Sequence, residues 1–280
     1  MWDRETRRGH GEVPCASASL RVPAETRPKP RRNLICVLLL TACASTTHPP
    51  LRILTYNIHA GKDATGKDNL ERVAAIVKST NADVVLLQEV DRNTTRSGNV
   101  DQVAELIRLT GMHGQFGKSL DYQGGEYGIA ILSRWPITGH QIVPLRVEPP
   151  QVRAGGSLEP RIALIVTTGS LRIANTHLDA SREDTYRLQE IPQVLAAARG
   201  MIAGGDFNST PDSAVHEQVL RAGRRDAWME CGRGDALTYP AITPQKRIDY
   251  LFLERGTRCS EATVIDTDAS DHRPVLVVVE

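Results

Sequence analysis

From Leu51 to the C-terminus, short apolar runs alternate with polar loops along the chain. Short runs bounded by polar turns are typical of β-strands. We therefore predict strands at residues 52–57, 83–88, 129–133, 162–167, 171–176, 248–253 and 274–279. A further strand-like run leads into the segment IAGGDFNSTP, residues 202–211, where Asp206 and Asn208 lie two positions apart and so share one face.

Helical periodicity occurs between these runs. Residues 68–78 place their apolar side chains on one face, and residues 100–110 repeat the pattern before a glycine. A third helix is predicted over residues 183–199, with a kink at Pro192. Strands and helices interleave without an internal repeat, which predicts an α/β or α+β fold in one domain over residues 51–280.

The first fifty residues differ from the rest of the chain. The basic, proline-rich segment RPKPRR precedes the apolar residues 34–40, and LTAC closes the run. This order predicts a signal peptide over residues 1–42, with an n-region so long that a start nearer Val22 is expected. Residues 40–43 resemble the bacterial lipobox, which predicts lipidation of Cys43 and a tether over residues 43–50; a buried cysteine in an ordinary signal sequence is the alternative. No run approaches the ~20 apolar residues of a membrane-spanning helix.

The charge balance changes once residues 1–42 are set aside. The whole chain has 34 Lys and Arg against 33 Asp and Glu, and the leader holds eight of the basic and four of the acidic residues, which leaves 26 against 29. Tight binding to nucleic acid depends on neutralising several phosphates, so a net charge of −3 favours a small-molecule or lipid-headgroup substrate over nucleic acid. If Lys246, Arg247, Arg255 and Arg258 formed a local basic rim, a nuclease would remain the alternative.

Two cysteines remain outside the leader and the lipobox. Cys231 and Cys259 could form a disulfide in an oxidising envelope compartment, or they could be two separately buried thiols.

Six predicted strands end in, or carry, side chains suited to catalysis or metal binding. These are Asn57, Glu89, His177, the pair Asp206 and Asn208, Asp249, and the pair Asp271 and His272. Singly, each has an ordinary explanation as a turn residue, a solvated strand end or a core histidine. Together they are unusual, because rigid strand ends can hold several groups within the tolerance that chemistry demands. Asp249 in a buried strand also needs a partner, and His272 could supply one.

Seven motifs occur in order from Thr55 to Pro274: TYNIH, LLQEVD, GIAILSR, NTHLD, GDFNSTP, RIDYLF and SDHRP. The ordered set resembles the endonuclease/exonuclease/phosphatase superfamily, which includes pancreatic-type deoxyribonucleases, abasic-site endonucleases, inositol polyphosphate 5-phosphatases and bacterial sphingomyelinases. The resemblance implies a DNase I-like, four-layer α/β/β/α sandwich of two mixed β-sheets, with a cleft at one sheet edge.

The resemblance also assigns a metal site. Glu89, with Asn57 and Asp271, would hold a divalent cation, and hard carboxylate and amide oxygens suit Mg²⁺, with Mn²⁺ as a substitute.

The catalytic roles implied by the resemblance fall on five residues. Asp206 would orient or deprotonate the attacking water, and Asn208 would hold a phosphate oxygen or that water. His272, steadied by Asp249, would bind the phosphate or transfer a proton. His177 would stabilise the transition state or protonate the leaving group.

Three further residues are expected near the cleft. Arg161 resembles a family arginine that contacts phosphate, although a surface strand charge explains it equally well. Tyr127 would line the cleft, and His59 would support the site without being a ligand.

The resulting interpretation is a metal-dependent phosphoesterase, expected to be a monomeric phosphodiesterase that is tethered to the bacterial envelope through Cys43. A secreted or periplasmic nuclease is the alternative enzyme. A non-catalytic binding lipoprotein on the same fold is an alternative of another class, and the presence of both Glu89 and His272 argues against it.

Overall fold

The structure is a computed structural model that describes residues 49–152 and 159–280, which belong to one compact unit. The predicted signal peptide, Cys43 and most of the tether lie outside the described residues.

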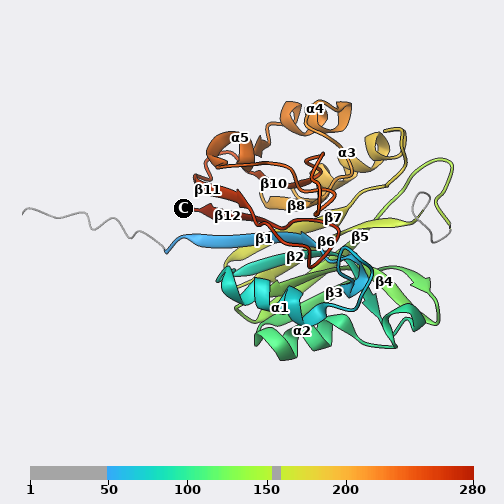
Figure 1. The fold of residues 1–280 in the computed structure, drawn as a ribbon. Coiled ribbons are helices and arrows are strands. Elements are labelled where there is room, and N and C mark those ends of the chain that lie inside the picture. The colour runs from blue at the N-terminus through green and yellow to red at the C-terminus, as the bar shows by residue number, and fades with distance from the viewer. Residues whose placement is uncertain (1–48, 153–158) are drawn as a thin grey trace, which may run out of the picture. The chain divides into compact units, whose positions relative to one another are not determined.

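Two six-stranded mixed β-sheets lie face to face (Figure 1). The first sheet has the order β11-β12-β1-β2-β4-β3, with β1 (Leu51–Asn57), β2 (Val84–Arg92), β3 (His113–Tyr122), β4 (Gly125–Ser133), β11 (Cys259–Val264) and β12 (Val275–Val279). The second has the order β5-β6-β7-β8-β10-β9, with β5 (Ile137–Leu145), β6 (Arg161–Thr168), β7 (Leu171–His177), β8 (Ile202–Asp206), β9 (Arg225–Asp226) and β10 (Asp249–Leu253). Each sheet has a single parallel pair near its centre, β1 with β2 and β7 with β8, while its other pairs are antiparallel.

Helices cover the outer faces of both sheets (Figure 1). Two, α1 (Leu70–Ser79) and α2 (Gln102–Thr110), pack on the first sheet through one apolar cluster that they share with it. Two more, α3 (Arg187–Ala197) and α4 (Ala214–Arg221), pack on the second sheet in the same way. The short α5 (Ala227–Cys231) follows β9 directly and packs beside β11. The result is the four-layer sandwich that the sequence motifs imply.

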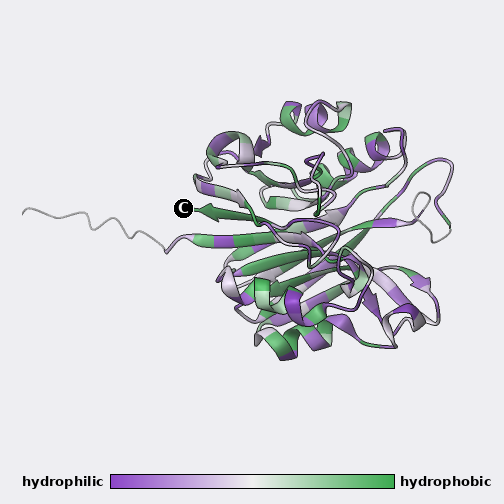
Figure 2. Cartoon of the chain, in the orientation of Figure 1, coloured by the Kyte–Doolittle hydropathy of each residue, from purple (hydrophilic) through white to green (hydrophobic). Residues whose placement is uncertain are grey.

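Alternation along the central strands explains why both faces of each sheet are buried. In β2, Val84 and Leu86 belong to the cluster between the sheets, whereas Val85 and Leu87 belong to the cluster under the helices. Successive strand residues point to opposite faces, so a continuous apolar run supplies both clusters. Figure 2 shows the consequence: the central strands are largely green, and the helices carry green on some turns and purple on others.

The predicted strands are confirmed with small shifts of their ends, and each is an interior strand of its sheet. The strands that the pattern did not predict are the four edge strands, β3, β5, β9 and β11. Edge strands such as β5 alternate between half-buried and exposed positions, so their apolar signal is weak. The short helices α4 and α5 were also not predicted, and α3 is shorter than expected, with Pro192 inside it.

Cys231, at the end of α5, and Cys259, at the start of β11, form a disulfide with their Cα atoms 5.9 Å apart. The paired alternative is therefore the one found in the structure. Within the described residues, no helix has the length and apolar character needed to cross a membrane.

Candidate active site

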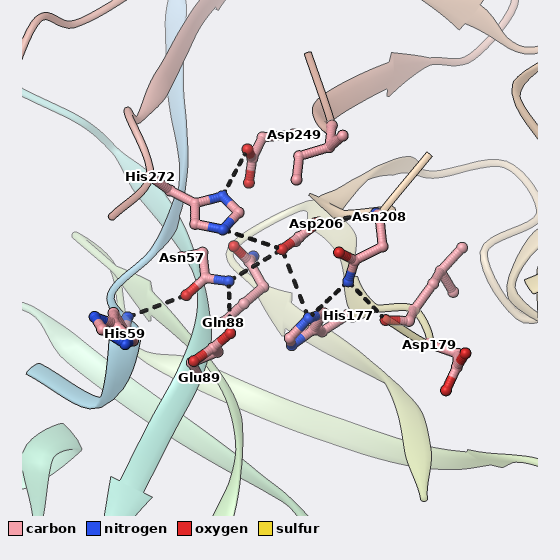
Figure 3. A network of polar contacts seen from close by, with 12 residues as sticks. Asn57, His59, Gln88, Glu89, His177, Asp179, Asp206, Asn208, Asp249 and His272 are labelled. Carbon is pink, nitrogen blue, oxygen red and sulfur yellow. Dashed lines mark hydrogen bonds and ion pairs between the residues drawn. The ribbon is translucent and has the colours of Figure 1, made fainter. Parts of the chain in front are cut away.

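The two parallel strand pairs end side by side and carry the predicted site residues. Asn57 ends β1 opposite Gln88 of β2, and His177 ends β7 opposite Asp206 of β8. Asp249, the first residue of β10, is also paired with Asp206. The carboxyl ends of parallel strands meet at one edge, so the topology brings these side chains together although they come from both sheets (Figure 3).

Glu89 lies at an irregularity in β2. The pairing of β2 with β4 changes register between Leu87 and Val90, and Glu89 has a φ of 54°. A positive φ is uncommon for a residue with a side chain and is typical of functional sites where the surrounding structure holds it. The bulge turns the half-buried Glu89 carboxylate toward Asn57, whose Nδ2 donates to Glu89 Oε1 at 3.1 Å.

Gly205 allows β8 to approach β7 closely. Its φ is +140°, and a Cβ at this position would lie 1.9 Å from the carbonyl oxygen of Thr176. No other residue can therefore occupy the position, and the close approach brings the following Asp206 to the end of His177's strand.

Asp206 is the centre of the site (Figure 3). Its Oδ2 accepts from Asn57 Nδ2 at 3.0 Å and lies 3.6 Å from His177 Nε2 and 3.7 Å from His272 Nε2. Its Oδ1 accepts from the backbone N–H of Asn208 at 2.9 Å. One buried carboxylate thus faces two imidazoles and one amide.

His272 is held by a carboxylate and an aromatic ring. Its Nδ1 lies 3.0 Å from Asp249 Oδ2, which confirms the geometry expected of this pair. The ring of Tyr239 lies against the imidazole with 4.7 Å between the ring centroids. The loop that carries His272 is also fixed to the first sheet. Ser270 Oγ donates to the carbonyl of Asn57 at 2.8 Å and so ties the SDHRP loop to β1.

His177 has a different environment. Arg161 NH1 lies 3.1 Å from His177 Nδ1, and Asn208 Nδ2 lies 3.1 Å from His177 Nε2. Asn208 also donates to the carbonyl of Leu178 at 3.0 Å, so a side chain that follows β8 is fixed over the end of β7.

These partners shift the pKa values of the buried groups in opposite directions. Burial alone would lower the pKa of His272, but the Asp249 and Asp206 carboxylates outweigh it and raise that pKa to about 10. Burial lowers the pKa of His177 well below its usual range, and the positive charges of Arg161 and His272 add to the effect. Burial, reinforced by the charge of Asp249, raises the pKa of Asp206 to about 7.

The donors around Glu89 fit a hard divalent cation. Glu89 offers carboxylate oxygens, of which one accepts a single hydrogen bond from Asn57, so lone pairs remain for a cation. Asp206, Asp249 and His272 form a second group, with one ligand atom from each lying within 4.8 Å of the others. In that group His272 Nδ1 is already bonded to Asp249, and we therefore favour the Glu89 side for the metal.

Asp271 lies at the margin of this arrangement. Its Oδ1 lies 3.8 Å from His59 Nδ1 and 3.3 Å from Ser270 Oγ, whose hydrogen is directed at the carbonyl of Asn57. The roles of Asp271 as a metal ligand and of His59 as a supporting residue stay predictions; the backbone N–H of His59 donates to Asn57 Oδ1.

Arg161 and Tyr127 are as deeply buried as the central residues of the site. Their exposed fractions are 3% and 6%, and Arg161 is directed at His177. Direct contact of either residue with phosphate stays a prediction.

Sequence reasoning missed several residues that build the site. Ser270 opens the SDHRP motif and Tyr239 lies eight residues before RIDYLF, but nothing in a serine or a tyrosine alone indicates a contact with a carbonyl or a histidine. Gln88 and Asn175 belong to the LLQEVD and NTHLD motifs, but the sequence assigned them no role: Gln88 Nε2 donates to Asn175 Oδ1 at 2.7 Å and so joins the two sheets beneath the site. Both are polar residues inside buried strands, where a polar side chain needs a hydrogen-bond partner, and this need was the signal available in the sequence.

A two-sheet sandwich with a carboxylate, two histidines and hard oxygen donors at one end is the architecture of a phosphoester hydrolase of the DNase I-like fold. The sequence profile of the Endonuclease/Exonuclease/phosphatase family matches residues 54–272, and the chain belongs to this family. Members of the family act on phosphoesters and are typically metal-dependent.

Individual relatives are distant. The chain is 26% identical over 243 residues to the uncharacterized protein YbhP of Escherichia coli K12, covering 80% of this chain and 94% of YbhP. It is 30% identical over 208 residues to an inositol phosphosphingolipids phospholipase C of Schizosaccharomyces pombe, covering 65% of this chain but only 46% of that protein. An endonuclease/exonuclease/phosphatase from Beutenbergia cavernae superposes with a TM-score of 0.70 at 23% identity, covering 83% of this chain and 72% of that one, which shows a shared fold.

Proposed function

We propose that the protein is a Mg²⁺-dependent phosphodiesterase of the bacterial envelope that acts on a small or lipid-headgroup phosphoester. The observation that carries the proposal is Asp206 Oδ2 lying 3.6 Å and 3.7 Å from two buried imidazoles whose pKa values are shifted in opposite directions. Groups whose environments drive their pKa values apart are typical of sites that both bind an anion and move a proton.

The roles of the residues follow from these charges. Near neutral pH His272 is an imidazolium that binds a phosphate oxygen, with Asp249 holding its Nδ1. Asp206, with a pKa of about 7, is matched to accept a proton from the attacking water. Neutral His177 and Asn208 hold another phosphate oxygen or the water. A cation held by Glu89, with Asn57 as a ligand once its amide oxygen is turned toward the cation, would polarise the phosphoryl group and neutralise charge.

Charge supports a diester of modest size. His272 faces Asp206, whereas Arg161 lies behind His177, so the side chains described at the site supply few positive charges for the backbone of a polyanion. Arg247 was expected in a basic rim, but it is buried and paired with Asp226 at 2.7 Å and so does not contribute to one.

The proposed location is supported by the disulfide. Disulfides persist in oxidising compartments, which agrees with export ahead of lipidation at Cys43.

The test of activity is a substrate panel with the purified full chain and Mg²⁺. Bis-p-nitrophenyl phosphate, p-nitrophenyl phosphate, inositol phosphates, phospholipid vesicles, RNA and plasmid DNA are compared, with Asp206→Asn as the control for contaminating activity. We expect hydrolysis of the diester or a lipid phosphoester, abolished by EDTA and nearly independent of salt. Efficient plasmid cleavage that falls steeply with salt would instead establish the nuclease.

The test of location is the intact mass of the protein from membranes of an expressing bacterium. We expect a mature N-terminus at a multiply acylated Cys43, and Cys43→Ala protein that stays uncleaved or is released from the membrane. Any other mature N-terminus would refute the anchor without affecting the proposed activity.

A further inference from the structure

The imidazole of His177 is enclosed by two hydrogen-bond donors. Arg161 NH1 faces Nδ1 at 3.1 Å and Asn208 Nδ2 faces Nε2 at the same distance. The ring is almost fully buried, with 5% of its side chain exposed. β6 begins at Arg161 and β7 ends at His177, and because Ala163 lies opposite Thr176 the two residues lie at adjoining ends of neighbouring strands.

A neutral imidazole cannot accept from both donors. It has one acceptor nitrogen and one N–H group. A guanidinium is always charged and can only donate, and its charge-assisted hydrogen bond is stronger than one from the neutral amide of Asn208. Nδ1 must therefore be the acceptor, and the proton must lie on Nε2.

We infer that Arg161 fixes His177 in the Nε2–H tautomer, so that His177 presents a permanent N–H donor to a phosphate oxygen instead of acting as the acid that protonates the leaving group. Arg161 is thus a positioning residue that acts through the histidine. The inference rests on the proposed phosphoester substrate for its catalytic meaning but not for the tautomer itself.

The surroundings of the ring support a neutral donor. Glu159 Oε2 lies 3.2 Å from Arg161 NH2 and holds the guanidinium behind the imidazole. Burial and the charge of Arg161 both keep the pKa of His177 well below its usual range, so the ring does not become an imidazolium near neutral pH. The Nε2–H group is directed at the site, where Asp206 Oδ2 is 3.6 Å away.

A bound phosphate would also resolve a conflict in the free site. With the proton on Nε2, the Asn208 Nδ2 group faces another donor at 3.1 Å, while it also donates to the carbonyl of Leu178. An oxygen atom of a substrate placed between these two N–H groups would accept from both. The pair then forms a small anion-binding fork opposite His272.

The tautomer can be measured directly by ¹⁵N NMR of the imidazole ring. The full chain is labelled with ¹⁵N-histidine, and the His177 signals are assigned by their loss in His177→Gln. We expect the two-bond correlation pattern of an Nε2–H tautomer near neutral pH. An Nδ1–H pattern or an imidazolium pattern in the unaltered protein would overturn the inference.

Substitutions at Arg161 test its cause. Arg161→Met keeps the length of the stem but removes the donor, and we expect the tautomers to mix and kcat to fall about 100-fold with little change in KM, since a catalytic histidine in the wrong tautomer is known to cost up to about 10⁴-fold. Arg161→Lys retains a donor and should retain most of the Nε2–H signal. Arg172→Met, on an exposed position of β7, is the matched control and should change neither quantity.

The outcomes separate this inference from the proposed function. An unchanged tautomer and kcat in folded Arg161→Met would refute the role of Arg161. If Arg161→Met fails to fold, the Arg161→Lys spectrum decides, because loss of the Nε2–H signal there would contradict a donor-fixed tautomer. An Nε2–H tautomer in a protein that hydrolyses no phosphoester would refute the function and leave the tautomer assignment intact.

Discussion

His177 and His272 are two buried histidines at the same carboxylate, and the molecule treats them in opposite ways. Both Nε2 atoms lie within 3.7 Å of Asp206 Oδ2, and both side chains are at most 6% exposed. The difference lies behind each ring, where Asp249 supports His272 and Arg161 supports His177.

This comparison shows that burial does not decide the charge of a histidine. Burial lowers the pKa of both rings, but a carboxylate partner reverses the shift for His272 and a guanidinium partner deepens it for His177. Near neutral pH the site thereby has one cation, His272, and one neutral imidazole, His177, from the same amino acid.

The largest effect is expected from removing the carboxylate that the two histidines share. Asp206→Asn should lower kcat/KM by about 10³-fold or more, because a positioned general base contributes about 10²–10⁴-fold. Thermal stability should not fall, since ionised Asp206 is disfavoured by burial and an amide is not. Activity and melting temperature are measured together; retained activity would mean that another group activates the water.

The pH profile distinguishes the two histidines. The rate should rise toward pH 7 as Asp206 ionises and fall near pH 10 as His272 loses its proton, with both values belonging to the interacting groups. His272→Gln should lower the rate by about 10²–10³-fold and remove the alkaline limb, whereas His177→Gln should lower the rate but keep both limbs. Loss of the alkaline limb in His177→Gln would reverse the assignment.

Removing the main metal carboxylate should affect metal affinity more than chemistry. Glu89→Gln is expected to raise the Mg²⁺ concentration for half-maximal activity by about 10–100-fold, with much of kcat recovered at saturating Mg²⁺, because the amide keeps an oxygen but loses the charge. Glu126→Gln, on β4, serves as a control. Unaltered Mg²⁺ dependence would exclude Glu89 and direct attention to Asp206, Asp249 and His272.

The smallest effect is a pH-dependent loss of stability in Asp249→Asn. Breaking a buried charge pair costs about 3 kcal/mol. The folded-state pKa of His272 is raised from 6.5 to about 10, so the pair's contribution is fully present below pH 6.5 and disappears as pH rises toward 10. Urea midpoints at pH 6, 8 and 10 should therefore converge between variant and unaltered protein; a constant difference would mean that Asp249 does not support a charged His272.

The sequence by itself determined the interior strands of the fold and the polar residues that meet at their ends. Interior strands are buried on both faces, so their continuous apolar runs predicted them. The polar residues at their ends stood out against these apolar runs. The edge strands β3, β5, β9 and β11 were not readable, because half of each faces away from the core and its pattern resembles a loop.

Only the tertiary structure decided what each site residue does. The sequence offered Arg161 as a phosphate contact and His177 as either an acid or a stabiliser, and the choice depends on which group lies behind the imidazole. Arg161 and His177 lie in neighbouring strands only because β6 pairs with β7. The positive φ of Glu89 likewise occurs where the pairing of β2 with β4 is irregular. Residue type and order give the functional groups of a site, whereas protonation and direction come from neighbours that are distant in the chain, which a local pattern does not encode.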